Sequence, residues 1–415
     1  MMSIRNDYDW CIQSRKLKIF MKKAVMYGAG NVGRGFIGKV FAESGYEVCF
    51  LDIDQVLIQG LSEKRSYTVH TVSNDEDYYT TVGGVYGVDG RSQQAIEEIA
   101  TCDIMATAVG VNVLPHIISN IVLGIQLRIQ RGGKPLNIIL AENQIDVDQL
   151  VGEWIGQELS EKEKKWADEN LGLVEASIGR MIPPLTEEER KKDPLLIAVE
   201  PYRALPVNSL GFKGGIPDLV GLVPFSPFDF YVKRKLFLHN MGHSICAYLG
   251  HEKGYEYVSQ AIEDPEVYKV VSGAMEESVK ALHKEYPKMP IEEIEENKED
   301  LLYRFGNRAL KDTIFRVAGD PVRKLRINDR LIGAALYCLS QGIIPEKIVE
   351  GIVSAYHYNQ SKDSSSVEVQ EMIKQFGIEE TVEKVSGIEK DSQLGRMILE
   401  KMRFSNLRIQ AILNE

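Results

Sequence analysis

The stretch Gly28-Ala29-Gly30-Asn31-Val32-Gly33 decides the fold of the N-terminal half of this 415-residue chain. It follows an apolar run, Ala24–Tyr27, which we expect to form a strand, and it opens Gly33–Ser44, which we expect to form a helix. In a G-x-G-x-x-G turn the first glycine makes the turn, the second lets the backbone approach a pyrophosphate, and the third lets helix and strand pack closely. The free N–H groups at the helix N-terminus then face the phosphates. The stretch therefore predicts a dinucleotide-binding domain of the Rossmann type.

An acidic residue at the end of the second predicted strand indicates which dinucleotide is bound. Asp52 follows the turn at about the ~20-residue spacing typical of this fingerprint. Its carboxylate can accept hydrogen bonds from both ribose hydroxyls and would repel a 2′-phosphate, which favours NAD over NADP. Asp54 is a competing candidate for the same role, less well placed because it lies beyond the strand end.

The rest of the first half alternates short strands with helical segments. We expect strands at Glu47–Leu51, Tyr67–Val72, Ile104–Val109 and Asn137–Ala141, and a helix around Pro115–Arg131. This alternation is typical of a mainly parallel sheet with helices on both faces, in which ligands bind beyond the carboxyl ends of the strands. The residues that we predict to contact the cofactor are Gly28, Ala29, Gly30, Asn31, Val32, Gly33, Arg34, Asp52, Thr107 and Val109. The same argument places Glu142 and Asn143 in the ligand crevice.

The second half has a different texture. From about Phe228 the pattern predicts long helices and few strands, at Asp229–His251, Glu266–Glu285, Arg330–Gln341, Pro345–Tyr358 and Val367–Phe376. The acidic run Glu292–Asp300 is interpreted as a solvated helix face or loop. We therefore expect an α/β Rossmann-type domain over residues 21–224, elaborated at Leu171–Val223, and a mostly α-helical substrate domain over residues 225–415, with a boundary near Pro224–Pro227. Residues 1–20 are expected to be an N-terminal extension.

Charge and cysteine content limit the partners. The formal net charge of −11 argues against a nucleic acid or an anionic membrane, but a local basic pocket could still hold a phosphorylated substrate. Five scattered cysteines without C-x-x-C spacing fit a reducing cytoplasm. No apolar run approaches the ~18 residues of a membrane span. The sequence does not give the oligomeric state, and a monomer is compatible with it.

A K-x4-N-x2-H pattern, Lys235, Asn240 and His243, carries the chemistry that we expect. On an α-helix at about 100° per residue, the three side chains project from one side. A lysine whose pKa burial lowers toward ~7–8 can act as a general base on an alcohol. Asn240 and Asn143 could donate hydrogen bonds to the developing alkoxide, and His243 could orient the substrate.

Two other interpretations of this segment remain open. One is a surface lysine beside a satisfied core histidine, without catalysis. The other is a metal site, because His239 and His243 have the i, i+4 spacing of zinc ligands. Against the metal, Asn240 stands where a metalloprotease has glutamate and no third ligand is spaced nearby. We predict no metal.

Taken in order along the chain, these residues resemble the polyol-specific long-chain dehydrogenases. The resemblance runs from about Met21 to near the C-terminus and has specific motifs. They are Gly28–Gly38, Thr107–Gly110, Leu136–Ile139, Glu142-Asn143, Arg180–Pro184, Asp193–Leu195, Arg234–Phe237, Gly273–Ser278 and Pro321–Leu325.

The resemblance implies an NAD-dependent, metal-independent interconversion of mannitol 1-phosphate and fructose 6-phosphate. It puts the catalytic lysine on Lys235 and its partners on Asn143, Asn240 and His243. For the substrate phosphate it favours Arg323 and Lys324, two residues that could equally have a surface role. Two residues depart from the family pattern: Arg308 stands where the family usually has proline, and Asn359 where a relative has arginine.

Other functions within reach of the same sequence are a mannitol 2-dehydrogenase and a fructuronate or tagaturonate reductase of the same superfamily. An NAD-binding protein without turnover is a further alternative, which the intact lysine constellation disfavours.

Overall fold

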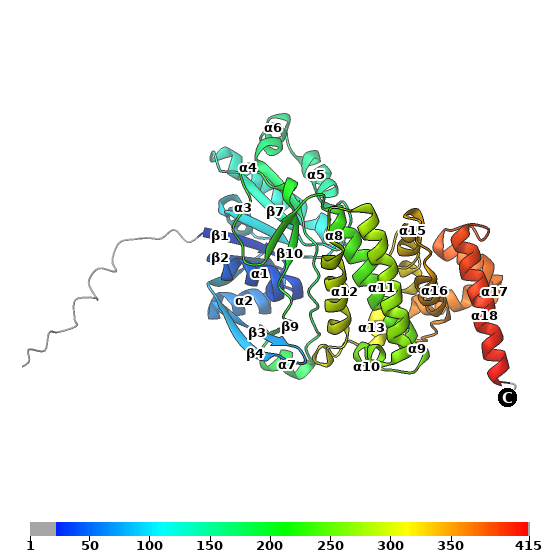
Figure 1. Cartoon of the computed structure of the whole chain (residues 1–415). Helices are drawn as coiled ribbons and strands as arrows, with labels where there is room; N and C mark the ends of the chain where they lie inside the picture. The colour runs from blue at the N-terminus through cyan, green and yellow to red at the C-terminus, as the bar shows by residue number, and fades with distance from the viewer. Residues whose placement is uncertain (1–21, 414–415) are drawn as a thin grey trace, which may run out of the picture.

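The computed structural model describes residues 22–413 of the chain, and the predicted extension at residues 1–20 lies outside them. An α/β part built on parallel strands is followed by a part made almost entirely of helices, and the two lie side by side (Figure 1). The predicted fold class, a Rossmann-type domain followed by a mostly α-helical domain, is confirmed.

A six-stranded parallel sheet forms the centre of the α/β part. Its strand order is β5-β2-β1-β6-β7-β8, and every neighbouring pair is parallel. The strands are β5 (Val85–Asp89), β2 (Tyr46–Asp52), β1 (Lys22–Tyr27), β6 (Ile104–Thr107), β7 (Leu136–Leu140) and β8 (Leu171–Glu175). The order reverses at β1, between β2 and β6, which is where such sheets bind ligands.

Both faces of this sheet are buried. Successive side chains of a strand point to opposite faces, so Ala24 and Met26 join one apolar core while Val25 and Tyr27 join the other. The helices of this part are η1 (Gly33–Ile37), α1 (Gly38–Glu43), α2 (Gln55–Lys64), α3 (Gln93–Thr101), α4 (Leu114–Gln130), α5 (Val147–Glu158) and α6 (Glu161–Asn170). The turn after β1 therefore leads directly into η1 and α1, as the fingerprint predicts, except that the first helical turn is π-helical.

One predicted strand lies outside the main sheet. Residues Tyr67–Val72 do form a strand, β3 (Ser66–Val72), but it pairs antiparallel with β4 (Asp77–Gly83) and parallel with β9 (Ile197–Val199). These three strands form a small separate sheet. The sequence pattern did not reveal the hairpin of β3 and β4. The elaboration also contains α7 (Glu187–Lys192), β10 (Leu205–Asn208), η2 (Ser209–Gly211) and β11 (Leu222–Phe225).

The helical part packs around one large apolar core. Its helices are α8 (Asp229–Arg234), η3 (Lys235–Asn240), α9 (Met241–Glu252), α10 (Val258–Glu263), α11 (Pro265–Glu285), α12 (Ile291–Phe305), η4 (Arg308–Leu310), α13 (Ile314–Ala318), α14 (Pro321–Lys324), α15 (Ile332–Ser340), α16 (Glu346–His357), α17 (Ser364–Ser386) and α18 (Gln393–Leu413). The acidic run 292–300 lies on α12, as a helix face. The predicted helix Val367–Phe376 is part of the longer α17, which bends at Gly377, where φ is +78°.

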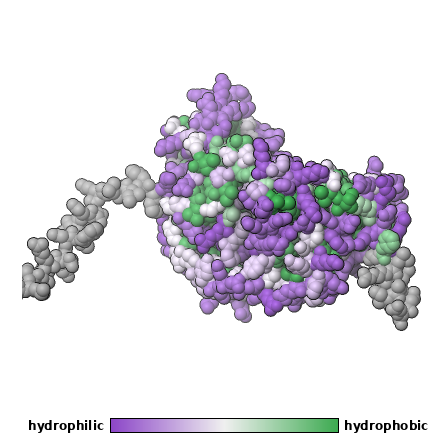
Figure 2. All heavy atoms as spheres, in the orientation of Figure 1, coloured by the Kyte–Doolittle hydropathy of each residue, from purple (hydrophilic) through white to green (hydrophobic). Residues whose placement is uncertain are grey.

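The surface agrees with the acidic composition. Figure 2 shows hydrophilic residues over much of one face of both parts, with apolar groups between them. Within residues 22–413, no helix combines the length and the apolar character that crossing a membrane would need.

Candidate active site

The glycine turn has the shape that a dinucleotide requires. Gly28 has φ +99°, and a Cβ on it would lie 2.5 Å from the carbonyl oxygen of Ala108. A Cβ on Gly33 would lie 1.9 Å from the carbonyl oxygen of Gly28, so strand and helix approach as closely as glycine allows. At Gly30, by contrast, a Cβ would meet nothing within 4 Å, which leaves open space for a pyrophosphate. The turn therefore fits a dinucleotide cofactor.

Asp52 is held at the carboxyl end of β2 against this turn. Its Oδ2 accepts a hydrogen bond from the Ala29 amide at 2.6 Å, and its Oδ1 accepts from the Ile53 amide at 2.7 Å. Asp54 instead caps α2, where its side chain accepts hydrogen bonds from the Val56 and Leu57 amides. The two carboxylates therefore differ in position: that of Asp52 is held on the glycine turn, and that of Asp54 caps α2.

Three further residues predicted to contact the cofactor are Arg34, Thr107 and Val109. The buried Arg34 guanidinium donates to the carbonyl oxygens of Ala29 (2.6 Å) and Leu195 (2.5 Å), so it stabilises the turn from the inside. The Thr107 side chain is fully buried. Val109, half-buried, lies where β6 has ended, and its amide donates to Glu142 Oε1 at 3.0 Å.

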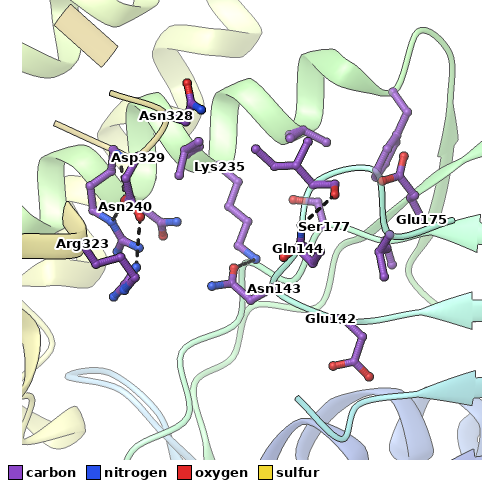
Figure 3. A pocket seen from close by; sticks show the side chains of 17 residues that line it. Glu142, Asn143, Gln144, Glu175, Ser177, Lys235, Asn240, Arg323, Asn328 and Asp329 are labelled. Atoms are coloured by element: carbon purple, nitrogen blue, oxygen red, sulfur yellow. Dashed lines mark hydrogen bonds and ion pairs between the residues drawn. The ribbon is translucent and has the colours of Figure 1, made fainter. Parts of the chain in front are cut away.

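A cavity of about 370 Å³ lies between the carboxyl edge of the sheet and the helical part (Figure 3). The loop after β7 contributes Asn143, the end of β8 contributes Glu175, and the π-helical turn η3 contributes Lys235 and Asn240. The complete lining is Glu142, Asn143, Gln144, Ile145, Val147, Glu175, Ala176, Ser177, Phe228, Val232, Lys235, Leu236, Asn240, Arg323, Asn328, Asp329 and Arg330. Three of the four predicted catalytic residues therefore meet in one cavity.

Lys235 reaches across this cavity to the α/β part. Its Nζ donates to Asn143 Oδ1 at 3.2 Å, a contact visible in Figure 3. The pKa of Lys235 is lowered to about 8, first because burial disfavours the charged ammonium and second because the Arg330 guanidinium repels it. A lysine in this state can exchange a proton near neutral pH.

The π-helical turn changes the geometry that an ideal α-helix predicts. On an α-helix, Lys235 and Asn240 would lie about 140° apart. In a π-helix the backbone hydrogen bond joins residues i and i+5, and these two residues are the first and last of η3. The wider π turn brings their directions closer together than on an α-helix, and both side chains line the same cavity. The i, i+5 spacing in the sequence was the available signal, but propensity alone does not predict a π turn.

His243 lies in an adjoining cavity of about 270 Å³ that Asn240 and Arg330 also line. Its Nε2 is 3.0 Å from Asp312 Oδ2, and its ring stacks on Phe305 with centroids 4.9 Å apart. The pKa of the neighbouring His239 is well below its usual value, because burial disfavours the charged ring. Over residues 22–413, no group of three His, Cys, Asp or Glu side chains is arranged to hold a metal ion.

The two residues predicted for the substrate phosphate have different positions. Arg323 lines the 370 Å³ cavity, where its guanidinium pairs with Asp320 (2.7 Å) and Asp329 (3.1 Å). Lys324 does not reach the cavity: it is buried, and its Nζ donates to the carbonyl oxygens of Val317 and Gly319. Arg330 lines the cavity instead, and its Nε lies 2.7 Å from Asp329 Oδ1.

Sequence reasoning also missed two interactions between distant residues: the hydrogen bonds that Glu142 accepts and a buried ion pair of Arg304. Glu142 accepts from the amides of Val109 (3.0 Å) and Gly110 (2.8 Å), which ties the loop after β7 to the loop after β6. Between the two parts, Arg304 of α12 pairs with Glu200 at 2.9 Å and 2.5 Å, with both side chains buried. Neither pair has a recognisable spacing, because its members lie far apart in the sequence.

Comparisons with known proteins agree with this architecture. The model of the mannitol dehydrogenase Rossmann domain matches residues 22–221, and that of the mannitol dehydrogenase C-terminal domain matches residues 228–412. The chain is 34% identical over 384 residues to a mannitol-1-phosphate 5-dehydrogenase of Brevibacillus brevis, covering 92% of this chain and 97% of the relative.

Two solved structures share the fold at low identity. One is a substrate-free D-sorbitol dehydrogenase, with a TM-score of 0.76 and 16% identity over 92% of this chain and 93% of the other. The second is the mannitol 2-dehydrogenase of Pseudomonas fluorescens in complex with NAD and D-mannitol, with a TM-score of 0.72 and 14% identity over 95% and 93% of the chains. The family models span nearly the whole described chain, and the prediction of an alcohol dehydrogenase is confirmed at this level. This chain therefore belongs to the mannitol dehydrogenase family and is a polyol dehydrogenase.

Proposed function

We propose that this enzyme interconverts D-mannitol 1-phosphate and D-fructose 6-phosphate with NAD, using Lys235 as the general base and no metal. The observation that carries the proposal is the Lys235 amine, with a pKa of about 8, placed 3.2 Å from Asn143 Oδ1 in the cavity at the carboxyl edge of the sheet. The name of the 34% identical relative supports the choice of substrate.

In the oxidative direction, the neutral Lys235 amine accepts the proton of the C5 hydroxyl while the hydride leaves C5. NAD, when bound, accepts that hydride. In the reverse direction the Lys235 ammonium returns the proton to the carbonyl oxygen. Because the ammonium supplies both the proton and a positive charge beside the oxygen, this chemistry proceeds without a metal.

The neighbouring amides stabilise the charge on the reacting oxygen. Asn143 presents its Oδ1 to Lys235, so its Nδ2 group is the donor left for the substrate. Asn240, on the same π turn as Lys235, adds a second donor from the helical side of the cavity. His243 lies beside Asn240 in the adjoining cavity, and its pairing with Asp312 fixes the ring for a hydrogen bond from substrate.

The cofactor preference follows from Asp52. Its carboxylate lies beside the Ala29 amide, at the position from which it can bond the ribose hydroxyls. A 2′-phosphate there would meet this negative charge at short range. We therefore assign NAD rather than NADP. The turn residues Gly28, Ala29, Gly30, Asn31, Val32 and Gly33 would hold the pyrophosphate by their backbone.

The phosphate of the substrate is assigned to Arg323 and Arg330. Both guanidinium groups line the cavity that holds Lys235, and both contact Asp329. A phosphate dianion can compete with Asp329 for one face of each group, because arginine forms bidentate contacts with phosphate. Asn328, in the same wall, is a further donor.

We place the reaction in the reducing cytoplasm, with NAD as the cofactor and a small sugar or polyol phosphate as the substrate. Cys49, Cys102, Cys246 and Cys338 support this placement, since all four are buried free thiols.

Absorbance at 340 nm tests the substrate directly, by following NADH oxidation with fructose 6-phosphate and with fructose in the presence of a chelator. The proposal predicts kcat/KM at least 100-fold higher for the phosphate ester, with no effect of the chelator. A preference for fructose, or turnover only with fructuronate or tagaturonate, would contradict the proposal and assign the enzyme to another substrate class. Loss of activity with the chelator would contradict the metal-free chemistry.

A further inference from the structure

A second large cavity lies outside the glycine turn, away from Lys235. It has a volume of about 550 Å³ and is bounded on one side by Gly30 and Asn31 of the turn and by Asp54 at the start of α2. The opposite side comes from the elaboration, around α7. The remaining lining residues are Arg34, Val56, Leu57, Leu185, Glu187, Arg190, Lys191, Pro194, Leu196 and Ile197.

The elaboration is anchored over the turn by contacts just after α7. Arg34, one residue past the fingerprint, donates to the Leu195 carbonyl oxygen at 2.5 Å. Asp193 pairs with Lys64 of α2 at 3.3 Å. The Leu195 side chain packs so closely on α2 that a Cβ on Gly60 would lie 3.2 Å from it. These contacts fix the position of α7 relative to the glycine turn.

Two cations of α7 face this cavity without strong partners of their own. Arg190 is exposed, and within the described part of the chain it makes no side-chain hydrogen bond or ion pair. Lys191 pairs with Glu187 at 3.7 Å, with side chains 80% and 90% exposed, and a solvated pair of this kind contributes little. Both long side chains are therefore free to turn toward an anion in the cavity.

The anion that fits is the pyrophosphate of the dinucleotide. The backbone of Gly30 and Asn31, which would touch a pyrophosphate in this turn, lines the same cavity as Arg190 and Lys191. Arg34 also lines the cavity, but its Nε and Nη1 already donate to carbonyl oxygens, so these two nitrogens are not available to a phosphate. Asp54 and Glu187 also line the cavity, and the cations of α7 would offset their negative charge beside a pyrophosphate.

We propose that Arg190 and Lys191 bind the pyrophosphate of the cofactor, so that α7 forms the outer wall of the dinucleotide site. The assignment rests on the proposed use of a dinucleotide, but not on the proposed sugar substrate. It adds to the fingerprint two contacts from a segment some 160 residues further along the chain, which no glycine motif predicts.

The test compares the double variant Arg190→Gln/Lys191→Gln with wild type in calorimetric titrations of NADH, ADP-ribose and adenosine. We expect binding of NADH and of ADP-ribose to weaken about tenfold, since two charge-assisted contacts to phosphate are lost, while adenosine binding changes less than twofold. Lys192→Gln, on the same helix but outside the cavity, is the matched control and should bind all three ligands as wild type does. The charge-conserving Arg190→Lys/Lys191→Arg should keep NADH affinity within threefold.

Each other outcome overturns the assignment. Unchanged ADP-ribose affinity in the double variant removes both residues from the site. An equal loss for adenosine shows that the wall itself has been damaged and that the cations do not act on the pyrophosphate. All readings are of binding, so they stand even if the enzyme proves inactive on fructose 6-phosphate. If wild type binds none of the three ligands, dinucleotide use itself fails.

Discussion

Lys235 Nζ lies 3.2 Å from Asn143 Oδ1, and the contact joins residues 92 positions apart in the sequence. Asn143 follows strand β7 of the α/β part, whereas Lys235 begins the π turn of the helical part. The proposed base and its amide partner therefore meet only when the two parts pack together, with the cofactor edge on one side and the helices on the other. The buried Arg304–Glu200 pair is one of the contacts that hold this arrangement.

The pKa of about 8 at Lys235 predicts opposite pH profiles for the two directions. Oxidation of mannitol 1-phosphate needs the neutral amine, so kcat/KM should rise about tenfold per pH unit below this pKa and level off above it. Reduction of fructose 6-phosphate needs the ammonium, so its kcat/KM should be level below the pKa and fall above it. Profiles that rise and fall together in both directions would assign the titration to another group.

Asn143→Asp should move these profiles to higher pH. The new carboxylate would lie beside the amine and stabilise the ammonium, which raises the pKa of Lys235. For the oxidation of mannitol 1-phosphate, the midpoint of the pH profile should shift upward by at least one pH unit, and kcat at neutral pH should fall at least tenfold. Asn143→Ala is the matched control: it removes the amide without adding charge, and it should lower kcat with a smaller shift. Superimposable pH profiles for Asn143→Asp and wild type would show that residue 143 does not influence the pKa of the catalytic base.

Arg323→Gln tests the phosphate assignment. Losing one charged donor to phosphate should raise KM for fructose 6-phosphate about tenfold while leaving KM for unphosphorylated fructose unchanged. Arg326→Gln serves as control, because Arg326 is exposed and does not line the cavity. Equal KM changes for phosphorylated and unphosphorylated sugars would show that Arg323 acts on the cavity shape and not on the phosphate.

Arg304→Met should destabilise the protein by about 3–5 kcal/mol, because it leaves the Glu200 carboxylate buried without its partner. The free energy of unfolding in urea measures this change. Asp300→Asn removes an exposed partner of the same arginine, 3.1 Å away, and should cost less than about 1 kcal/mol. Similar losses for the two variants would contradict the structural role given to the buried pair.

The sequence was most informative where structure depends on neighbouring residues. The glycine turn, Asp52 and the strands around them follow from local spacing, and each is present in the structure. The alternation of apolar residues could not reveal that β3 leaves the main sheet, because its partners β4 and β9 are chosen by tertiary packing.

Side-chain direction was the hardest feature to predict. Arg34, Thr107 and Lys324 all follow or belong to motifs, yet their side chains point into the protein, where two of them bond carbonyl oxygens. Arg330 was overlooked because it reaches the cavity from a loop before α15. The π turn at Lys235 also escaped prediction, since π turns are rare and occur as single turns within α-helices, whose sequence pattern they share.

The most direct test of the mechanism is Lys235→Ala, assayed for fructose 6-phosphate reduction by NADH alongside a titration of NADH binding. Loss of a general acid and base should lower kcat by about 10²–10⁴-fold, while the Kd for NADH stays within twofold, since Lys235 lies outside the glycine turn. Turnover close to that of wild type, with NADH binding intact, would contradict the assignment of Lys235 as the catalytic base.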